Sequence, residues 1–169
     1  MTLPNSSVLL FNNNSTLASL FFWMGLGGYE PTSLKIWLQL AKVSANIYDV
    51  GANFGVFGLI AKAEKPSAKI HFFEPLIRNV RLIQKNIEVN RFSDCFVNNV
   101  AVSEQDGKAN FFDMDLEENT IASFDEEFIK KHAFSKALIK IEVLCRSLDS
   151  YFSGDRTSVD LLKHRCRRA

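Results

Sequence analysis

The stretch Tyr48-Asp49-Val50-Gly51-Ala52-Asn53-Phe54-Gly55 decides the fold of this chain. It follows a short run of β-type residues and precedes a segment with the apolar pattern of a helix. Gly51 allows the chain to turn sharply off the strand, and Gly55 allows the helix to pack close to the sheet and to a ligand. Asn53 takes the middle position, and Asn tolerates left-handed backbone geometry. The stretch therefore predicts a nucleotide-type loop between a strand and a helix.

Two acidic residues give this loop a chemical character. Asp49, at the end of the strand, would place a carboxylate at the mouth of the crevice, where it repels a pyrophosphate and attracts the ammonium group of an amino-acid tail. This charge argument favours S-adenosylmethionine over NAD. Glu74 ends the next β-type run, about 20 residues past the glycine loop, where an acid can hold both ribose hydroxyls of an adenosine. Alone, Glu74 would be interpreted as a solvated acid at a helix start; combined with the loop, it predicts ribose binding.

The rest of the chain alternates between helical and strand periodicity. Apolar residues recur at helical spacing over Leu34–Val43 and over Leu76–Ile87, and Pro75 suits the first turn of the second helix. Ser147 has the character of an N-cap for one further helical turn. The β-type runs are Ile47–Val50, Ala68–Phe73, Cys95–Val97, Val100–Val102, Ala109–Phe112 and Leu138–Cys145. This order predicts an α/β, Rossmann-like fold with a doubly wound, mostly parallel sheet.

Composition excludes several classes of protein. The 169 residues carry a net charge of +1 and are 47% hydrophobic, which is typical of a globular domain and gives no global attraction to nucleic acid. Cys95, Cys145 and Cys166 lack the spacing of a metal site, so no metal is expected. Cys95 and Cys145 are interpreted as buried free thiols of a reducing compartment. The apolar stretch 17–28 predicts a packed helix too short to span a bilayer. We therefore expect a cytoplasmic protein without a stable membrane span.

Several motifs together resemble the FkbM-type methyltransferase family. They are the glycine loop, Phe73-Glu74-Pro75, Lys85-Asn86 with Asn90, Asn99-Val100-Ala101-Val102-Ser103 and Ser147-Leu148-Asp149. The resemblance covers about Lys35 to Lys163 and implies a Rossmann-like class I methyltransferase domain. It also implies methyl transfer from S-adenosylmethionine, usually to an oxygen atom, with a small molecule or a glycan as acceptor. The cofactor-binding residues that it implies are Asp49, Gly51, Ala52, Asn53 and Gly55 at the methionine end, Glu74 at the ribose, and Asn99 and Ala101 near the adenine.

The end of the sequence departs from the family pattern. Family members continue from the fourth strand as Lys-Ile-Asp-Val-Glu-Gly, whereas here Lys163 is followed by His-Arg-Cys-Arg-Arg-Ala. This tail can be encoded by the codons CAT CGA TGT CGA AGG GCA, and without their first C these codons would encode Ile-Asp-Val-Glu-Gly. The sequence thus predicts a loose segment with one apolar helix over 1–33, an incomplete methyltransferase domain over 34–163 with its later strands missing, and an out-of-frame tail over 164–169.

Alternatives to an active methyltransferase stay open at this point. An NAD-dependent oxidoreductase would need Gly-x-Gly-x-x-Gly, which the segment from Gly51 to Gly55 does not supply. A non-enzymatic remnant, inactive through truncation, would keep the cofactor loop without turnover. His71 lies inside an apolar strand and is interpreted as a packed histidine rather than a base. No Ser-His-Asp or paired-carboxylate arrangement can be assembled, so no catalytic residue is predicted.

Overall fold

A computed structural model describes residues 7–10, 16–114, 125–127, 138–153 and 158–164 of the chain. The predictions of a loose N-terminal segment and of an out-of-frame tail fall largely on residues 1–6, 11–15 and 165–169, which lie outside the described residues. Both stay predictions.

The main sheet has four parallel strands in the order β3-β2-β1-β7. The strands are β1 (Asn46–Val50), β2 (Lys69–Phe73), β3 (Cys95–Asn98) and β7 (Leu161–His164). The order reverses between β1 and β7, since the chain moves from β1 outward to β3 and then returns to the other side of β1. In open α/β sheets, ligands bind at the carboxyl ends of the strands beside such a switch point. The predicted α/β fold with a mostly parallel sheet is confirmed.

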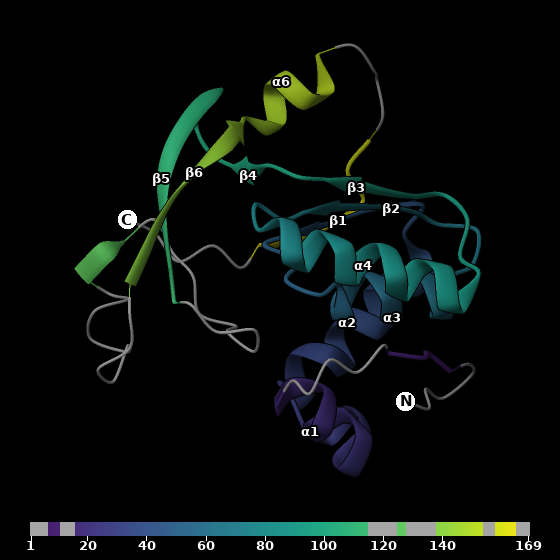
Figure 1. Ribbon diagram of the computed structural model, residues 1–169. Helices are drawn as coiled ribbons and strands as arrows, with labels where there is room; N and C mark the ends of the chain where they lie inside the picture. The colour runs from purple at the N-terminus through teal and green to yellow at the C-terminus, as the bar shows by residue number, and fades with distance from the viewer. Residues whose placement is uncertain (1–6, 11–15, 115–124, 128–137, 154–157, 165–169) are drawn as a thin grey trace.

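Helices cover both faces of this sheet, as a doubly wound domain requires (Figure 1). One face carries α2 (Pro31–Val43), α3 (Val56–Glu64) and α4 (Ile77–Asn90), and the other carries the short α6 (Leu148–Phe152). The larger core cluster lies under the three helices, where Trp37, Leu59 and Ile70 are buried. On the α6 side, Tyr48 and Phe73 pack beneath the helix. The strands are therefore apolar on both faces, as parallel strands between two helical layers must be.

His71 lies in β2 on the α6 side of the sheet. Its ring stacks on Tyr48 at a centroid distance of 4.5 Å and on Phe96 at 4.7 Å. Its Nδ1 lies 2.8 Å from the Tyr151 hydroxyl. The interpretation of His71 as a packed histidine is confirmed, because its ring is enclosed by aromatic neighbours.

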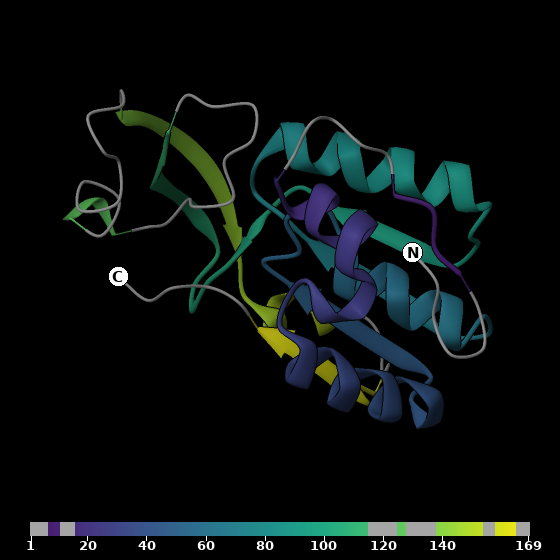
Figure 2. The same cartoon turned by 90° about the horizontal axis from the view of Figure 1, so that it is seen from below.

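A second sheet of three strands stands apart from the main one (Figures 1 and 2). It is formed by β4 (Ala101–Val102), β5 (Gly107–Met114) and β6 (Leu138–Arg146), with β6 in the middle and antiparallel to β5. The β-type runs before and after Asn99 thus join different sheets. Asn99 redirects the chain, because its Nδ2 donates to the carbonyls of Glu74 at 2.9 Å and of Pro75 at 2.8 Å.

One ion pair ties the second sheet to the main domain. The Arg78 guanidinium on α4 contacts both carboxylate oxygens of Asp113 on β5, with Nη2 at 2.9 Å from Oδ1. Asp113 is 3% exposed, so its charge depends on this partner.

Helix ends show where local prediction succeeds and where it fails. The Ser147 cap of α6 is confirmed, because its Oγ accepts the N–H of Ser150 at 3.0 Å. Helix α4 begins at Ile77, so the placement of Pro75 in its first turn is wrong. The carboxylate of Glu74 accepts the N–H of Leu76 at 3.0 Å and holds the residues before the helix in a non-helical path.

The N-terminal apolar stretch forms α1 (Thr16–Met24) and a 3-10 turn at Gly25–Gly27. The helix predicted there is confirmed. Within the described ranges, no helix has the length and apolarity needed to traverse a bilayer.

Asp160 fixes the start of β7 against β1. Its Oδ2 accepts the backbone N–H groups of Ala45 at 2.8 Å and Asn46 at 2.9 Å, and its own N–H donates to the Asn46 carbonyl at 3.1 Å. The two N–H bonds hold the pKa of the Asp160 carboxyl below its usual range.

Candidate functional site

The glycine loop between β1 and α3 has the strained geometry that its sequence predicts. Gly51, Asn53 and Gly55 have φ values of 67°, 56° and 85°, all in the left-handed region. A Cβ on Gly55 would lie 3.2 Å from both Phe72 Cε1 on β2 and Ile83 Cγ1 on α4, which is closer than ordinary contact, so glycine is favoured at this close approach. The predicted left-handed Asn53 and close packing at Gly55 are both confirmed.

The loop is bonded to the end of β2. The N–H groups of Gly51 and Ala52 both donate to the Phe73 carbonyl, at 3.0 and 3.1 Å. The N–H of Asn53 donates to Glu74 Oε2 at 2.7 Å. The two segments that sequence analysis assigned to one cofactor are therefore in direct contact.

Glu74 is a buried carboxylate with several N–H donors around it. It is 5% exposed, and Oε1 accepts from the N–H of Leu76 at 3.0 Å and from Asn79 Nδ2 at 3.2 Å. Burial raises the pKa of Glu74 to about 7, against the opposing effect of these hydrogen bonds. Each carboxylate oxygen accepts about two hydrogen bonds, so Oε2, which receives Asn53, keeps acceptor capacity for a hydroxyl. A carboxylate oxygen with spare acceptor capacity is the group that a ribose hydroxyl would require.

Asp49 is placed differently from its sequence-based interpretation. Its side chain is fully buried, and Oδ2 accepts the N–H of Gly58 in the first turn of α3 at 3.0 Å. Oδ1 accepts Lys163 Nζ at 2.8 Å. The open carboxylate expected at the mouth of the crevice is therefore corrected to a buried one. The carboxylate accepts hydrogen bonds from an N–H in the first turn of α3, which has no partner within the helix, and from a lysine ammonium.

Lys163 is the polar residue of the site to which sequence reasoning assigned no role. It lies directly opposite Asp49 in the β1–β7 register, and its Nζ also donates to the Gly51 carbonyl at 3.2 Å. The ammonium lies 5.0 Å from the centroid of the Phe57 ring. Opposite charges facing each other across neighbouring strands attract. The pairing of Lys163 with Asp49 can be predicted from the sequence only once β7 is known to be the neighbour of β1.

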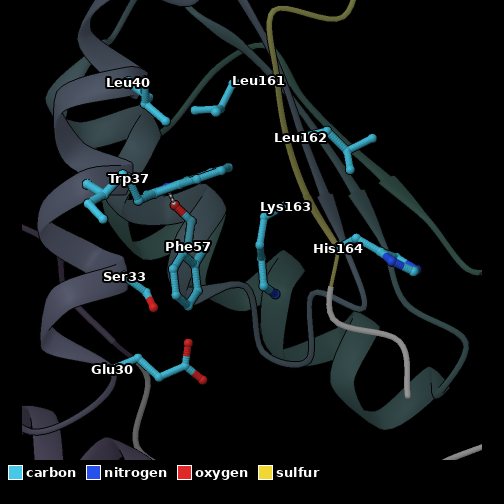
Figure 3. A pocket seen from close by; sticks show the side chains of 10 residues that line it. Glu30, Ser33, Trp37, Leu40, Phe57, Leu161, Leu162, Lys163 and His164 are labelled. Carbon is cyan, nitrogen blue, oxygen red and sulfur yellow. Dashed lines mark hydrogen bonds between the residues drawn. The ribbon is translucent and has the colours of Figure 1, made fainter. Parts of the chain in front are cut away.

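A pocket of about 440 Å³ lies between α2, the start of α3 and β7 (Figure 3). Its apolar part is walled by α2 and by Leu161, and the Trp37 indole N–H donates to the Phe57 carbonyl at 2.8 Å. Figure 3 shows the Lys163 ammonium and the Glu30 carboxylate at the same end of this pocket. The lining residues are Glu30, Ser33, Ile36, Trp37, Leu40, Phe57, Leu161, Leu162, Lys163 and His164.

The two residues predicted near the adenine occupy different surroundings. Asn99 is exposed and lies beside Glu74, whose carbonyl its side chain binds. Ala101 is 3% exposed and packs in the second core cluster with Leu76 and Val143, so its methyl group faces the protein interior. Among the residues with described positions, no three His, Cys, Asp or Glu side chains gather as a metal site requires.

Known proteins resemble this chain in sequence over most of its length and in structure over a smaller part. The sequence profile described as "Methyltransferase FkbM domain" matches residues 49–164. No curated protein matches the chain. Among solved structures, a SAM-dependent methyltransferase from Agrobacterium tumefaciens aligns with a TM-score of 0.37 and 9% identity, covering 41% of this chain and 23% of that one. Pyrococcus abyssi tRNA (uracil-54, C5)-methyltransferase, solved with S-adenosyl-L-homocysteine, aligns at 0.35 and 15% identity, covering 46% and 22%.

Proposed function

Since this chain belongs to the FkbM methyltransferase family, we propose that it binds S-adenosylmethionine over the carboxyl ends of β1 and β2 and transfers its methyl group to an oxygen atom. The family profile covers more than half of the chain and begins at Asp49, the first acid of the glycine loop. Membership confirms the predicted family, and it supports the proposed methyltransferase activity with S-adenosylmethionine as cofactor. The structural alignments with this chain cover less than a quarter of each of the two solved structures. The activity and the acceptor of the whole protein are therefore proposals.

The contact between Asn53 and Glu74 carries this proposal. A loop with three left-handed residues brings its N–H groups toward the end of β2, and the acid there keeps acceptor capacity for a ribose hydroxyl. A dinucleotide site would instead need a third glycine and a helix N-terminus open to a pyrophosphate. Here the N–H of Gly58, in the first turn of α3, already donates to Asp49. The arrangement favours a cofactor without a pyrophosphate.

When bound, S-adenosylmethionine supplies an electrophilic methyl group for in-line displacement. The role of this chain is to bind and orient the cofactor. Glu74 holds the ribose, and the glycine loop brings the backbone close to the ligand. Orientation alone accounts for a large share of the acceleration of such transfers. A carboxylate acceptor needs only to be held in line with the methyl group, whereas a hydroxyl acceptor must also release its proton, to water or to a base. No catalytic base is assigned among the described residues.

The acceptor is proposed to be a hydroxyl or carboxyl oxygen of a small molecule or a glycan. This proposal follows from the family, whose members usually methylate oxygen. A panel of sugars and hydroxy acids incubated with radiolabelled S-adenosylmethionine tests it. Label transferred to nitrogen-only acceptors would contradict it.

Calorimetry with S-adenosylhomocysteine tests the cofactor proposal directly, with NADH as the matched control. We expect saturable binding of S-adenosylhomocysteine and none of NADH. Binding of NADH alone would favour an oxidoreductase. Binding of neither ligand would favour a remnant that keeps the fold without the function.

A further inference from the structure

The charge that a ligand meets beside the glycine loop is positive. Asp49 is completely buried, whereas the Lys163 side chain is 14% exposed and lines the pocket of Figure 3. The carboxylate is covered on one side by the N–H of Gly58 and on the other by the lysine ammonium. The sequence alone indicates a carboxylate at this position, so the fold reverses the sign of the accessible charge.

The Lys163 ammonium has donor capacity toward the pocket. A lysine ammonium carries three N–H donors. Its acceptors within the described part of the chain are Asp49 Oδ1 at 2.8 Å and the Gly51 carbonyl at 3.2 Å, both on the side of the loop. The Phe57 ring lies on the pocket side, 5.0 Å from Nζ. Asp49 and Gly51 thus hold the ammonium in a fixed position against an aromatic wall.

We propose that Lys163 binds the α-carboxylate of the amino-acid tail of the cofactor. Glu30, at the same end of the pocket, gives that end a charge of opposite sign, which suits the zwitterionic tail (Figure 3). Asp49 is then a positioning residue that acts through Lys163. The inference rests on the proposed function, because it assigns one end of the proposed cofactor.

Binding of three ligands that differ in the amino-acid tail measures the contribution of each end of the cofactor. S-adenosylhomocysteine carries the complete tail, its decarboxylated analogue keeps the amine but lacks the carboxylate, and 5′-methylthioadenosine lacks the tail. In the wild-type protein we expect S-adenosylhomocysteine to bind about tenfold to a hundredfold more tightly than the decarboxylated analogue, which is the size of one charge-assisted hydrogen bond. In Lys163→Met this preference should disappear, while the affinity for 5′-methylthioadenosine stays within about twofold.

Two further variants keep the experiment informative if Lys163→Met folds poorly because Asp49 is left buried and unpaired. Lys163→Arg keeps the positive charge and should retain the preference for the carboxylate. The double variant Asp49→Asn/Lys163→Met removes both charges together and should lose the preference without leaving a buried charge. Circular dichroism of each variant confirms that it is folded before titration.

The outcomes separate this inference from the proposed function. If the wild-type protein binds none of the three ligands, the proposed function fails and the inference fails with it. If it binds 5′-methylthioadenosine but does not distinguish the other two ligands, only the inference is overturned. Tighter binding of S-adenosylhomocysteine by Lys163→Met would overturn it as well, because the lysine would then compete with the ligand amine for Asp49 and Gly51.

Discussion

The backbone N–H of Asn53 donates to Oε2 of Glu74 across 2.7 Å, and this bond joins the glycine loop of β1 to the end of β2. Asn53 has a φ of 56°, so the direction of its N–H depends on a left-handed conformation. The conformation of the loop and the ionisation of Glu74 are therefore coupled, because an ionised carboxylate is the stronger acceptor.

Removing the Glu74 carboxylate should weaken cofactor binding. Glu74→Ala eliminates the charge-assisted bond proposed for the ribose and releases the N–H of Asn53, so the Kd for S-adenosylhomocysteine should rise roughly tenfold to a hundredfold. Calorimetry checks this value. Glu104→Ala removes an exposed carboxylate elsewhere and serves as the matched control. Equal affinities in Glu74→Ala and the control would remove Glu74 from the site.

The stability of the protein should depend on pH through Glu74. Burial raises its pKa from 4.5 to about 7, so the folded state keeps a proton that the unfolded chain releases in that range. The free energy of unfolding should therefore fall as the pH rises from 4.5 to about 7 and then level off. The free energy of unfolding of Glu74→Gln should not show this dependence on pH. Urea denaturation of both proteins across the range measures it, and parallel pH profiles would contradict the shift.

Alanine at Gly58 should destabilise the protein although alanine is the better helix former. The added Cβ would lie 2.2 Å from Phe72 Cε1 and 3.0 Å from Ile70 Cγ2. Overpacking of this kind costs about 1–3 kcal/mol, which outweighs a helix-propensity gain of at most about 1 kcal/mol. Gly27→Ala, where a Cβ meets nothing within 4 Å, is the control. A gain in melting temperature for Gly58→Ala would show that α3 can move away from the sheet.

Asp113→Ala should loosen the second sheet from α4. Breaking a buried ion pair costs about 3–5 kcal/mol, but the Arg78 side chain is 34% exposed and regains water. We therefore expect a loss of about 1–2 kcal/mol, measured by urea denaturation. Glu142→Ala breaks the Lys108–Glu142 pair, whose side chains are both 61% exposed, and should change stability little. Equal effects of the two variants would contradict a role for the buried pair.

The parts of the site that depend on neighbouring residues were predictable from the sequence. Gly51, Asn53 and Gly55 lie within one turn, and left-handed backbone geometry restricts which residues can occupy it. Glu74 was predictable because the end of one strand and the loop of its neighbour must meet in a parallel sheet. The α/β fold itself followed from the alternation of strand and helix patterns.

Contacts between distant parts of the chain were not predictable. Lys163 reaches Asp49 across 114 positions of sequence, and only the strand order places the two side by side. The same strand order explains why a carboxylate expected to face a ligand is buried. Ala101 faces the second core cluster because its strand pairs with β6 rather than with the main sheet. Periodicity indicates that a strand exists, but it does not identify its partner.

Asp160 determines on which face of the sheet the Lys163 side chain lies. The Asp160 carboxylate, just before β7 and three residues before Lys163 in the chain, accepts the backbone N–H groups of Ala45 and Asn46 at the start of β1. Side chains alternate along a strand, so slipping β7 by a single residue would turn the lysine to the α6 side and present Leu162 to Asp49. A buried carboxylate would then face a hydrocarbon chain. The binding proposed for Lys163 at the carboxyl end of the sheet thus depends on a side chain at the opposite end of the strands, which a ligand there would not touch.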